Sequence, residues 1–364
     1  MEITIPHEQL TTALELVSRV STKHVTLPVL QCVRVEATTT GITLQATNLE
    51  ISVEIPLTGK VIETGITAVP TQIFLQSIQF LTEQEITLRL EDTTLQIETK
   101  VSSTSIKTFS VDEFPNLHKL QGTALPIQGS LFALGIKSVA FAASQTSIKP
   151  ELGSVFIQQK KEHSLTMVAT DSFRLMEKTV PQKGLILEQS IMIPQKNALE
   201  LARICETVQE DPQLLQTENM IALQFPGGVY VSSRLVTGNF PDYAQIIPKE
   251  FSTYATVLKA DLIRSFKKTS IFLNKFRQVT LVVTDQDITI SSQNAEVGHT
   301  TNTVKAAVEG DELTLSFNQQ YIMDPLNYTT DESVKMSFAG LGRAMIMTGI
   351  SDSTFRYLVM PMNK

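Results

Sequence analysis

The sequence predicts an α+β protein made of three similar domains, and three observations support this fold class. The chain of 364 residues is longer than one hydrophobic core usually organises. A helix, a pair of strands and a second helix recur in the same order with a period of about 124 residues. Between these helices, polar and apolar residues alternate with many Thr, Val and Ile, which is typical of antiparallel strands.

The first helix of each repeat is predicted from an amphipathic pattern. The segment 7–20 (HEQLTTALELVSRV) places Leu10 and Leu14 on one stripe and polar residues on the opposite stripe. Segments that begin at Ser130 and Leu258 stand at the equivalent places of the other two repeats. Each helix is expected to bury one stripe against a sheet and to leave the other stripe in water.

The second helix of each repeat follows a short run of β-forming residues. These segments start at Thr67, Ser190 and Glu312, and the helix within each begins near a Pro or an Asn. Proline is tolerated at a helix start because its missing N–H would be unpaired there. Strand pairs are expected at 42–55, 164–180 and 278–292.

Linkers are predicted where Pro and Gly cluster, at 114–127 and 240–251. The expected domains are therefore 1–120, 127–245 and 250–364.

The composition argues against several classes of protein. No apolar run reaches the length of about 18 residues that could cross a bilayer, and the acidic start MEITIPHEQL is unlike a signal peptide. Cys32 and Cys205 lie far apart, with neither a CxxC neighbour nor a His cluster, so neither a disulfide framework nor a metal site is expected. A cytoplasmic protein with two reduced, buried thiols and no cofactor is expected.

Positive charge is concentrated in one segment of an otherwise acidic chain. The formal net charge of -7, taken alone, argues against nucleic acid. The segment 258–277 nevertheless holds one acid, Asp261, and six cations: Lys259, Arg264, Lys267, Lys268, Lys275 and Arg277. Its apolar stripe is predicted to consist of Leu258, Leu262, Phe266 and Leu273. Arg264, Lys267 and Lys268 are therefore expected to project into solvent.

The middle repeat adds further cations. Lys137 and Lys149 have no acid between them, and Lys196 and Arg203 share one face of the second helix. A solvated helix face explains any one of these lysines. Their joint placement on repeated helices favours a surface for duplex DNA. Because no recognition helix or zinc finger is present, binding is expected to be independent of base sequence.

A curved array of three similar domains either closes or continues as a filament. A soluble protein closes more readily through a symmetric dimer. The repeat therefore predicts six domains around a hole, with the wet helix stripes turned toward it.

Six segments, in matching order and spacing, resemble the bacterial sliding clamps, the beta subunit of DNA polymerase III, over the full length of the chain. They are TLPVL (26–30), ATNLEISV (from Ala46), DEFPNL (from Asp112), ATDSFRL (169–175), SRLVTGNFPDY (233–243) and YLVMPM (357–362). The resemblance implies a head-to-tail homodimeric ring of six clamp domains, with helices inside and antiparallel sheets outside. It implies a processivity factor that slides on duplex DNA and catalyses nothing. The implied partners are the DNA polymerase III alpha subunit, the clamp loader and repair proteins.

The resemblance also implies a pocket between the second and third domains for a short peptide that contains Gln and Leu or Phe. Carried over position by position, the pocket uses Leu152, Thr170, Phe173, Arg174, Leu175, Pro241, Gln245, Ile246, Ala344, Leu358, Val359, Met360, Pro361 and Met362. Phe173 stands where a smaller or His-like ring is common, and Gln245 stands where a basic residue is common. The chain also ends in Asn363 and Lys364 instead of a basic-apolar pair. A different peptide preference is therefore expected.

The resemblance completes the predicted DNA-binding and dimer residues. His24 takes the place of a basic residue that contacts DNA, so the DNA-binding set is His24, Lys137, Lys149, Lys196, Arg203, Arg264, Lys267 and Lys268. The dimer seam is implied where Ile271, Phe272 and Leu273 meet the strand around Thr104 and Ile106 of the partner subunit. Few charges surround that strand, which predicts apolar contact and pairing of edge strands.

Two other functions stay open from the residues alone. A hydrolase could use Asp171, Ser172 and one of the five histidines, which are His7, His24, His118, His163 and His299. No nucleophile motif, P-loop or HExxH supports it. A scaffold that binds peptides but never DNA is favoured by the acidic total, and the basic helix at 258–277 distinguishes it from a clamp.

Overall fold

The computed structural model describes residues 1–21, 26–100, 102–146, 148–187 and 189–362. These residues form antiparallel sheets and a few helices, so the predicted α+β class is confirmed. Among the residues described, no helix combines the length and the apolar character needed to span a bilayer.

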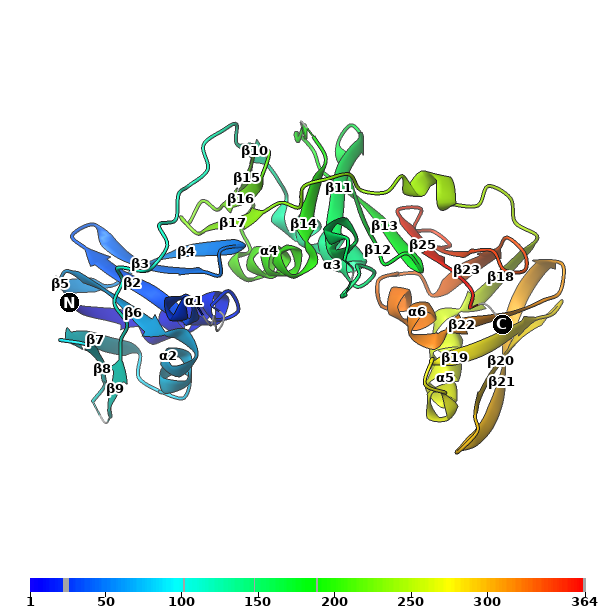
Figure 1. Ribbon diagram of the computed structural model, residues 1–364, viewed down its shortest axis with the longest axis horizontal. Helices are drawn as coiled ribbons and strands as arrows, with labels where there is room; N and C mark the ends of the chain where they lie inside the picture. Colours follow the sequence, from blue (N-terminus) through cyan, green and yellow to red (C-terminus); the bar gives the residue numbers. More distant parts are fainter. Residues whose placement is uncertain (22–25, 101, 147, 188, 363–364) are drawn as a thin grey trace. The chain divides into compact units, whose positions relative to one another are not determined.

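The first repeat of elements covers the N-terminal third (Figure 1). It consists of β1 (Glu2–Pro6), α1 (His7–Ser18), η1 (Pro28–Gln31), β2 (Cys32–Thr38), β3 (Gly41–Thr47), β4 (Ile51–Leu57), β5 (Lys60–Glu63), β6 (Gly65–Pro70), α2 (Thr71–Ile78), β7 (Glu85–Glu91), β8 (Thr94–Glu98) and β9 (Ser103–Lys107).

The second repeat has the same order of elements. It consists of β10 (Leu125–Pro126), α3 (Gly129–Ala140), η2 (Pro150–Gly153), β11 (Ser154–Lys161), β12 (Ser164–Thr170), β13 (Arg174–Pro181), β14 (Ile191–Pro194), α4 (Gln195–Val208), β15 (Gln213–Gln216), β16 (Met220–Gln224) and β17 (Tyr230–Arg234). The turn η3 (Tyr243–Ile246) lies in the following linker.

The third repeat completes the chain. It consists of β18 (Thr253–Leu258), α5 (Lys259–Thr269), η4 (Ser270–Phe272), β19 (Gln278–Val283), β20 (Asp287–Asn294), β21 (Gly298–Gly310), β22 (Leu313–Asn318), α6 (Gln319–Met323), η5 (Asp324–Asn327), β23 (Ser333–Phe338), β24 (Met345–Gly349) and β25 (Phe355–Val359). The threefold order of helix, strands and helix predicted from the sequence is confirmed.

The chain forms two compact units, one of residues 1–133 with 199–235 and the other of residues 134–198 with 236–364. The first unit holds a five-stranded sheet, β5-β1-β7-β8-β9, and an eight-stranded sheet, β10-β15-β16-β17-β4-β3-β2-β6. The second unit holds a twelve-stranded sheet, β14-β11-β12-β13-β25-β24-β23-β18-β21-β20-β19-β22.

Both large sheets run from one repeat into the next. Strand β4 pairs with β17, which we call the first junction, and β13 pairs with β25, which we call the second junction. The middle repeat therefore contributes strands to both units. The domain boundaries at 1–120, 127–245 and 250–364 stay predictions, because the two units divide the chain differently.

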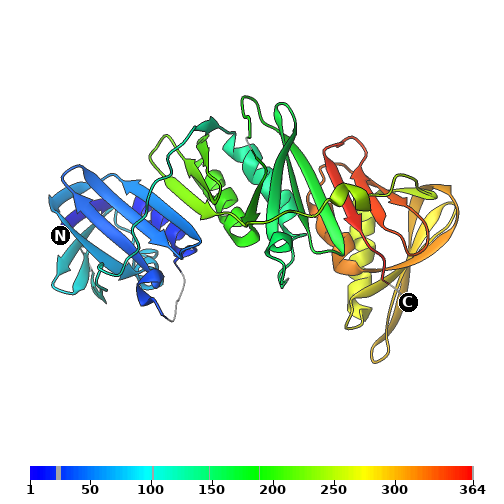
Figure 2. The ribbon, with the colours of Figure 1, turned by 45° about the horizontal axis from the view of Figure 1, so that its top comes forward.

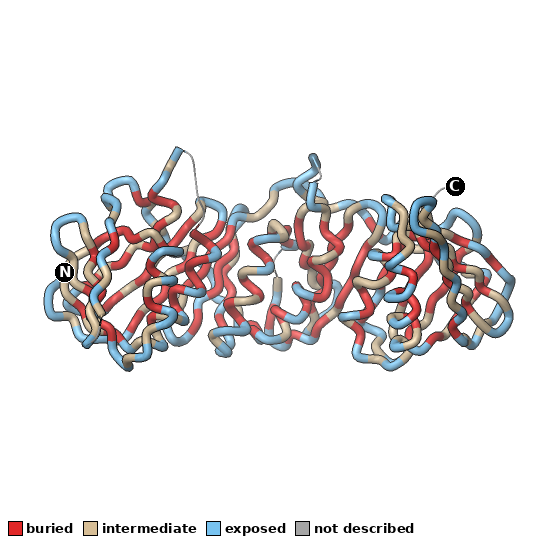
Figure 3. The backbone as a smooth tube through the Cα atoms, turned by 90° about the horizontal axis from the view of Figure 1, so that it is seen from below, coloured by how far each residue is buried: buried red, intermediate tan, exposed pale blue. Residues whose placement is uncertain are grey.

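The helices bury the stripes that the sequence predicts. Leu10 and Leu14 of α1 are fully buried, as are Leu262 and Phe266 of α5. Buried and exposed stretches of backbone alternate along the chain (Figure 3). Leu258 and Leu273 were also predicted on the buried stripe, and this was wrong. Leu258 is 53% exposed because it ends β18 and caps α5, outside the helical period. Leu273 lies beyond the end of α5 and is half-buried.

Candidate functional site

Two equivalent turns lead into the junction strands. Leu49, in the turn after β3, and Ser172, in the turn after β12, have φ of 75° and 76°. In each turn a side-chain oxygen, of Asn48 or of Asp171, accepts two backbone N–H groups. The shared geometry makes ATNLEISV and ATDSFRL equivalent parts of the repeat. The two junctions can therefore be compared position by position.

Arg174 fastens the second junction from within. Its Nε donates to Asp171 Oδ2 at 3.0 Å, and its Nη2 donates to the Phe141 carbonyl at 2.8 Å. Its Nη1 contacts Asp324 Oδ2 at 2.5 Å, and the guanidinium lies 4.4 Å from the centre of the Tyr321 ring. The Arg174 side chain is only 11% exposed, and its contacts join β13 to the segments that contain Phe141, Tyr321 and Asp324.

The contacts of Asp171 also argue against the hydrolase hypothesis, in which this residue was the acid. Both oxygens of Asp171 accept hydrogen bonds, Oδ1 from the backbone of the turn and Oδ2 from Arg174. A carboxylate held in this way serves the turn and the ion pair, and it is poorly suited to accept a hydrogen bond from a histidine that would activate Ser172.

Replacing Arg174 by Ala is expected to lower the free energy of unfolding by about 3–5 kcal/mol, because it leaves the carboxylates of Asp171 and Asp324 nearly buried without their cation. Urea denaturation measures the change. Arg343 is an exposed arginine of the same unit, and Arg343→Ala is expected to change stability by less than about 0.5 kcal/mol. Equal losses from both substitutions would contradict a special role for Arg174.

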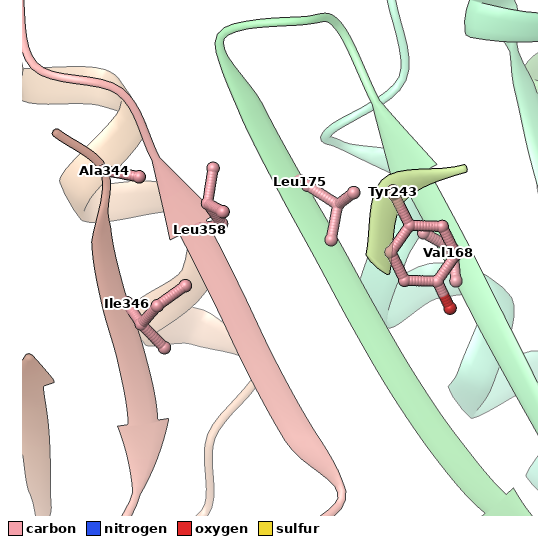
Figure 4. Packing of buried hydrophobic residues seen from close by; sticks show 6 residues of the cluster. All are labelled: Val168, Leu175, Tyr243, Ala344, Ile346 and Leu358. Atoms are coloured by element: carbon pink, nitrogen blue, oxygen red, sulfur yellow. The ribbon is translucent and has the colours of Figure 1, made fainter. Parts of the chain in front are cut away.

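The floor of the predicted peptide pocket is a buried apolar cluster in the second unit. It consists of Val168, Leu175, Tyr243, Ala344, Ile346 and Leu358. Leu175 and Leu358 face each other on paired strands, and Tyr243 lies beside Leu175 (Figure 4). Three predicted pocket residues, Leu175, Ala344 and Leu358, thus pack in one cluster. Thr170 is also buried, and its hydroxyl donates to the Arg174 carbonyl.

Other predicted pocket residues are exposed, and we call Phe173, Pro241, Gln245, Ile246 and Met360 the rim residues. Phe173, Ile246 and Met360 are 62%, 54% and 38% exposed, and the Met360 N–H donates to the Phe173 carbonyl at 2.8 Å. Pro241 and Gln245 are exposed as well, whereas Leu152, Pro361 and Met362 are half-buried. Val359 is fully buried, and strand alternation turns its side chain to the face opposite Leu358.

The two junctions differ, within the described residues, in the central pair of the floor. The pair Leu175 and Leu358 of the second junction corresponds to Ser52 and Ser232 at the same register of the first. Two serines offer a peptide side chain no apolar surface to bury. The two junctions therefore share their strand pairing, but the apolar pair is present at the second junction and is replaced by serines at the first.

The exposed face of α5 is cationic, as the sequence predicts. Arg264, Lys267 and Lys268 are exposed on the side opposite Leu262 and Phe266. Arg264 forms an exposed ion pair with Asp261 at 3.4 Å. The two lysines stand at the C-terminal end of the helix, where the helix dipole favours positive charge.

The other predicted DNA residues differ in how far they reach solvent. Lys137, Lys149 and Lys196 are exposed. Arg203 is only 21% exposed, since its Nε donates to Glu200 at 2.8 Å and its Nη2 donates to the Leu16 carbonyl at 2.9 Å. His24 lies outside the described residues.

Two strand edges stand near the predicted dimer residues. Strand β9 is the outer strand of the five-stranded sheet, and among the residues described the first part of β21, 298–305, pairs only with β20. The hairpin of β20 and β21 extends away from the rest of its unit (Figures 1 and 2).

The predicted dimer residues divide into buried and exposed ones. Ile271 is 68% exposed, whereas Phe272, Leu273 and Thr104 are half-buried. Ile106 is buried in its own core, opposite Leu95 on β8. Its side chain therefore packs within its own subunit, and the part of β9 around Ile106 can pair with another subunit through its backbone.

Several residues near the predicted sites were not predicted from the sequence. Ile73 and Phe80, 53% and 82% exposed, lie on and just after α2, which contacts β9. The signal in the sequence was their spacing of seven residues, which places two apolar side chains on one side of a helix. Glu177, which is buried beside the floor cluster and accepts a hydrogen bond from the Tyr243 hydroxyl, was not predicted from the sequence either.

Comparison with known proteins identifies the family. Models of the N-terminal, central and C-terminal domains of the DNA polymerase III beta subunit match residues 1–118, 126–242 and 244–363. The chain is 28% identical to the beta sliding clamp of Proteus mirabilis over 100% of both chains. It is 26% identical to the beta sliding clamp homolog GriR of Streptomyces muensis over 99% of both chains.

The fold comparison agrees. The crystal structure of the DNA polymerase III beta subunit of Thermotoga maritima superposes with a TM-score of 0.94, at 23% identity, over 100% of this chain and 99% of that one. Three consecutive domain models that together cover nearly the whole sequence show that the chain belongs to the DNA polymerase III beta subunit family, the sliding clamps, which are accessory processivity factors of DNA replication and not catalysts.

Proposed function

We propose that this clamp works as a head-to-tail homodimer that encircles duplex DNA in the cytoplasm, slides without base preference and binds its partners through the pocket at the second junction. Those partners are the DNA polymerase III alpha subunit, the clamp loader and other proteins that carry a clamp-binding peptide.

The pair of available strand edges carries the proposal of ring closure. In the repeat, β9 corresponds to β17 and β25, and β21 corresponds to β4 and β13. Within the chain these equivalents pair with each other at the two junctions. The β9 edge of one protomer and the β21 edge of another are therefore the complementary halves of a third junction. Two such junctions related by a twofold axis close the ring.

Apolar residues flank both edges and support the same seam. Ile73 and Phe80 lie near β9, and Ile271 and Val297 lie near β21. Their burial between protomers removes from water a surface that an isolated chain leaves exposed. The outward row of β9, Ser103, Ser105 and Lys107, contains no acid, so apolar contact and backbone pairing dominate the seam.

The cationic faces supply the DNA contacts. Lys267, Lys268 and Arg264 on α5, with Lys137, Lys149 and Lys196, attract phosphates without contacting bases. Arg203 contributes charge from a fixed position. His24, which takes the place of a basic residue, belongs to the same proposed set.

The peptide pocket combines the buried floor with the exposed rim. Leu175, Leu358 and Ala344 offer apolar surface, and Phe173, Ile246 and Met360 can close over a peptide side chain. Each buried Leu or Phe anchor is worth about 1.5–3 kcal/mol, so two or three anchors fit micromolar affinity after the cost of association. Weak binding of this kind allows partners to exchange.

Measuring the mass in solution tests the ring. The wild-type protein is expected at twice the chain mass of 40.3 kDa. Ile271→Asp is expected to shift the particle to the mass of a single chain, because it places an unpaired charge in an apolar seam. The folded chain should tolerate this substitution, since Ile271 is 68% exposed.

Ile350 provides the matched control. It is 56% exposed and lies just after β24, away from β9 and β21 in the strand order. Ile350→Asp is expected to leave the dimer intact. A wild-type monomer, or a dimer that survives Ile271→Asp, would overturn the proposed seam.

A further inference from the structure

A buried carboxylate lies beside the floor cluster, two residues after Leu175 on β13 and on the same face of the sheet. Glu177 of β13 is 7% exposed, and its Oε2 accepts a hydrogen bond from the Tyr243 hydroxyl at 2.6 Å. The same oxygen accepts from Lys160 Nζ at 2.7 Å, and Oε1 lies 3.5 Å from Arg356 Nη1. A charge so deep in a protein persists only when its oxygens are paired. All four side chains belong to the second unit.

Burial and hydrogen bonding keep Glu177 and Tyr243 in one protonation state at neutral pH. Burial alone would raise the pKa of Glu177, but hydrogen bonds from Lys160 and Tyr243 outweigh it and hold the pKa below its usual value. Burial, and then the Glu177 carboxylate, raise the pKa of Tyr243. At neutral pH the carboxylate is therefore charged and the hydroxyl is protonated, which is the combination that makes a strong hydrogen bond.

Tyr243 connects this carboxylate to the pocket. Its ring packs in the floor with Leu175 and Leu358 (Figure 4). The Lys160 ammonium lies 4.8 Å from the ring centre. Tyr243 is also the first residue of η3, the turn that carries the rim residues Gln245 and Ile246. The position of its hydroxyl therefore fixes both a wall of the floor and one side of the rim.

The first junction contains an equivalent carboxylate without a pocket. Glu54 of β4 stands at the same distance from its turn as Glu177, and its Oε1 lies 2.7 Å from Lys119 Nζ. Lys119 again lies near a tyrosine ring, that of Tyr230, whose hydroxyl accepts the N–H of Leu120. At both junctions a glutamate at one position of the repeat thus fastens the linker that follows. Leu120 of the first linker packs against a smaller apolar cluster, Leu215, Ala222 and Tyr230, and serines replace the Leu175 and Leu358 pair there.

We propose that Glu177 is a positioning residue of the peptide pocket: through the Tyr243 hydroxyl it sets the place of η3 against the floor, and it thereby governs peptide affinity without touching the peptide. This inference rests on the proposed function of the second junction as a peptide site. Glu54 fastens the first linker in the same way, through Lys119, at a junction where Ser52 and Ser232 replace the apolar pair.

Binding of a short synthetic peptide with one Gln followed by Leu and Phe, measured by calorimetry on the full-length protein, tests the proposal. Glu177→Ala and Tyr243→Phe are each expected to weaken binding about tenfold, the size of a lost charge-assisted hydrogen bond. The double variant is expected to bind no more weakly than either single variant, since both remove the same hydrogen bond. Glu177→Gln keeps an acceptor for the Tyr243 hydroxyl and is expected to recover part of the affinity.

Glu54→Ala is the matched control, because it removes the equivalent carboxylate from the other unit. Thermal melting of all variants reports whether they fold. Unchanged affinity in Tyr243→Phe, additive losses in the double variant, or an equal loss in Glu54→Ala would each overturn the proposal. Absence of peptide binding by the wild-type protein would instead refute the pocket itself. If Glu177→Ala fails to fold, Glu177→Gln and Tyr243→Phe decide the question.

Discussion

With Lys267 and Lys268 both replaced by Glu, the clamp is expected to lose about a hundredfold in affinity for primed DNA at moderate salt. Both lysines are exposed on α5, and neither belongs to the buried stripe of Leu262 and Phe266 that packs the helix into its domain. In a ring of two protomers the double substitution removes four phosphate contacts. Each contact contributes about 0.9 to the slope of log affinity against log salt, so the slope is expected to fall by about three to four. Loading assays at several salt concentrations measure both quantities.

A matched charge change separates local contact from net charge. Lys161 and Lys183 are exposed lysines of the same unit outside the helices. Lys161→Glu with Lys183→Glu changes the total charge equally and is expected to leave loading nearly unchanged, because screening limits charge effects to about 10 Å. Both double variants should bind peptide normally. Unaltered loading after the α5 substitutions would favour a scaffold that binds peptides and never encloses DNA.

The order of elements could be predicted from sequence because it depends on local pattern. Helix α5 illustrates this: Leu262 and Phe266 repeat at helical spacing, and the lysines fall on the opposite stripe whatever the rest of the chain does. The strand pairs were equally visible from alternation, as in SLTMVATDSFRLMEKTV. Leu258 was misassigned because the helical period was extended by one residue into the end of β18.

The details of the sites depend on contacts between distant parts of the chain. Glu177 lies in an alternating strand and looks like any solvent-facing acid, and it becomes buried only when Tyr243 of the linker and Arg356 of β25 meet it. Arg174 was predicted as a ligand contact, but Asp324, far along the chain, engages its guanidinium. Ile106 was placed at the dimer seam, yet its pairing with Leu95 points its side chain into the core. Periodicity carries no information about such partners.

Some expectations came from the resemblance to a family and not from pattern. ATDSFRL and YLVMPM appear unremarkable by themselves, a strand end and a terminal strand. The structure brings them together as paired strands, with Leu175 opposite Leu358. The comparison with Ser52 and Ser232 at the first junction gives a physical reason for the pocket to lie at the second.

Removing residues 360–364 is expected to weaken binding of a clamp-motif peptide about a hundredfold while leaving DNA loading intact. Met360 is part of the exposed rim, and its N–H donates to the Phe173 carbonyl, so its loss also frees Phe173. Two methionine contacts at about 1.5 kcal/mol each, the lower end for a buried side chain of this size, correspond to about two orders of magnitude in affinity. The thioethers suit a pocket that accepts varied peptides.

A shorter truncation tests whether the methionines or the terminus itself matters. Deleting only residues 363 and 364 keeps Met360, Pro361 and Met362 in place and is expected to change peptide affinity by less than about threefold. Titration of a fluorescent peptide compares the two truncations with Met360→Ala, which should lie between them. Undiminished affinity after removal of 360–364 would refute the assignment of this rim. Loss of DNA loading together with peptide binding would indicate damage to β25 and the second junction, because the proposed DNA contacts and the proposed pocket consist of different residues.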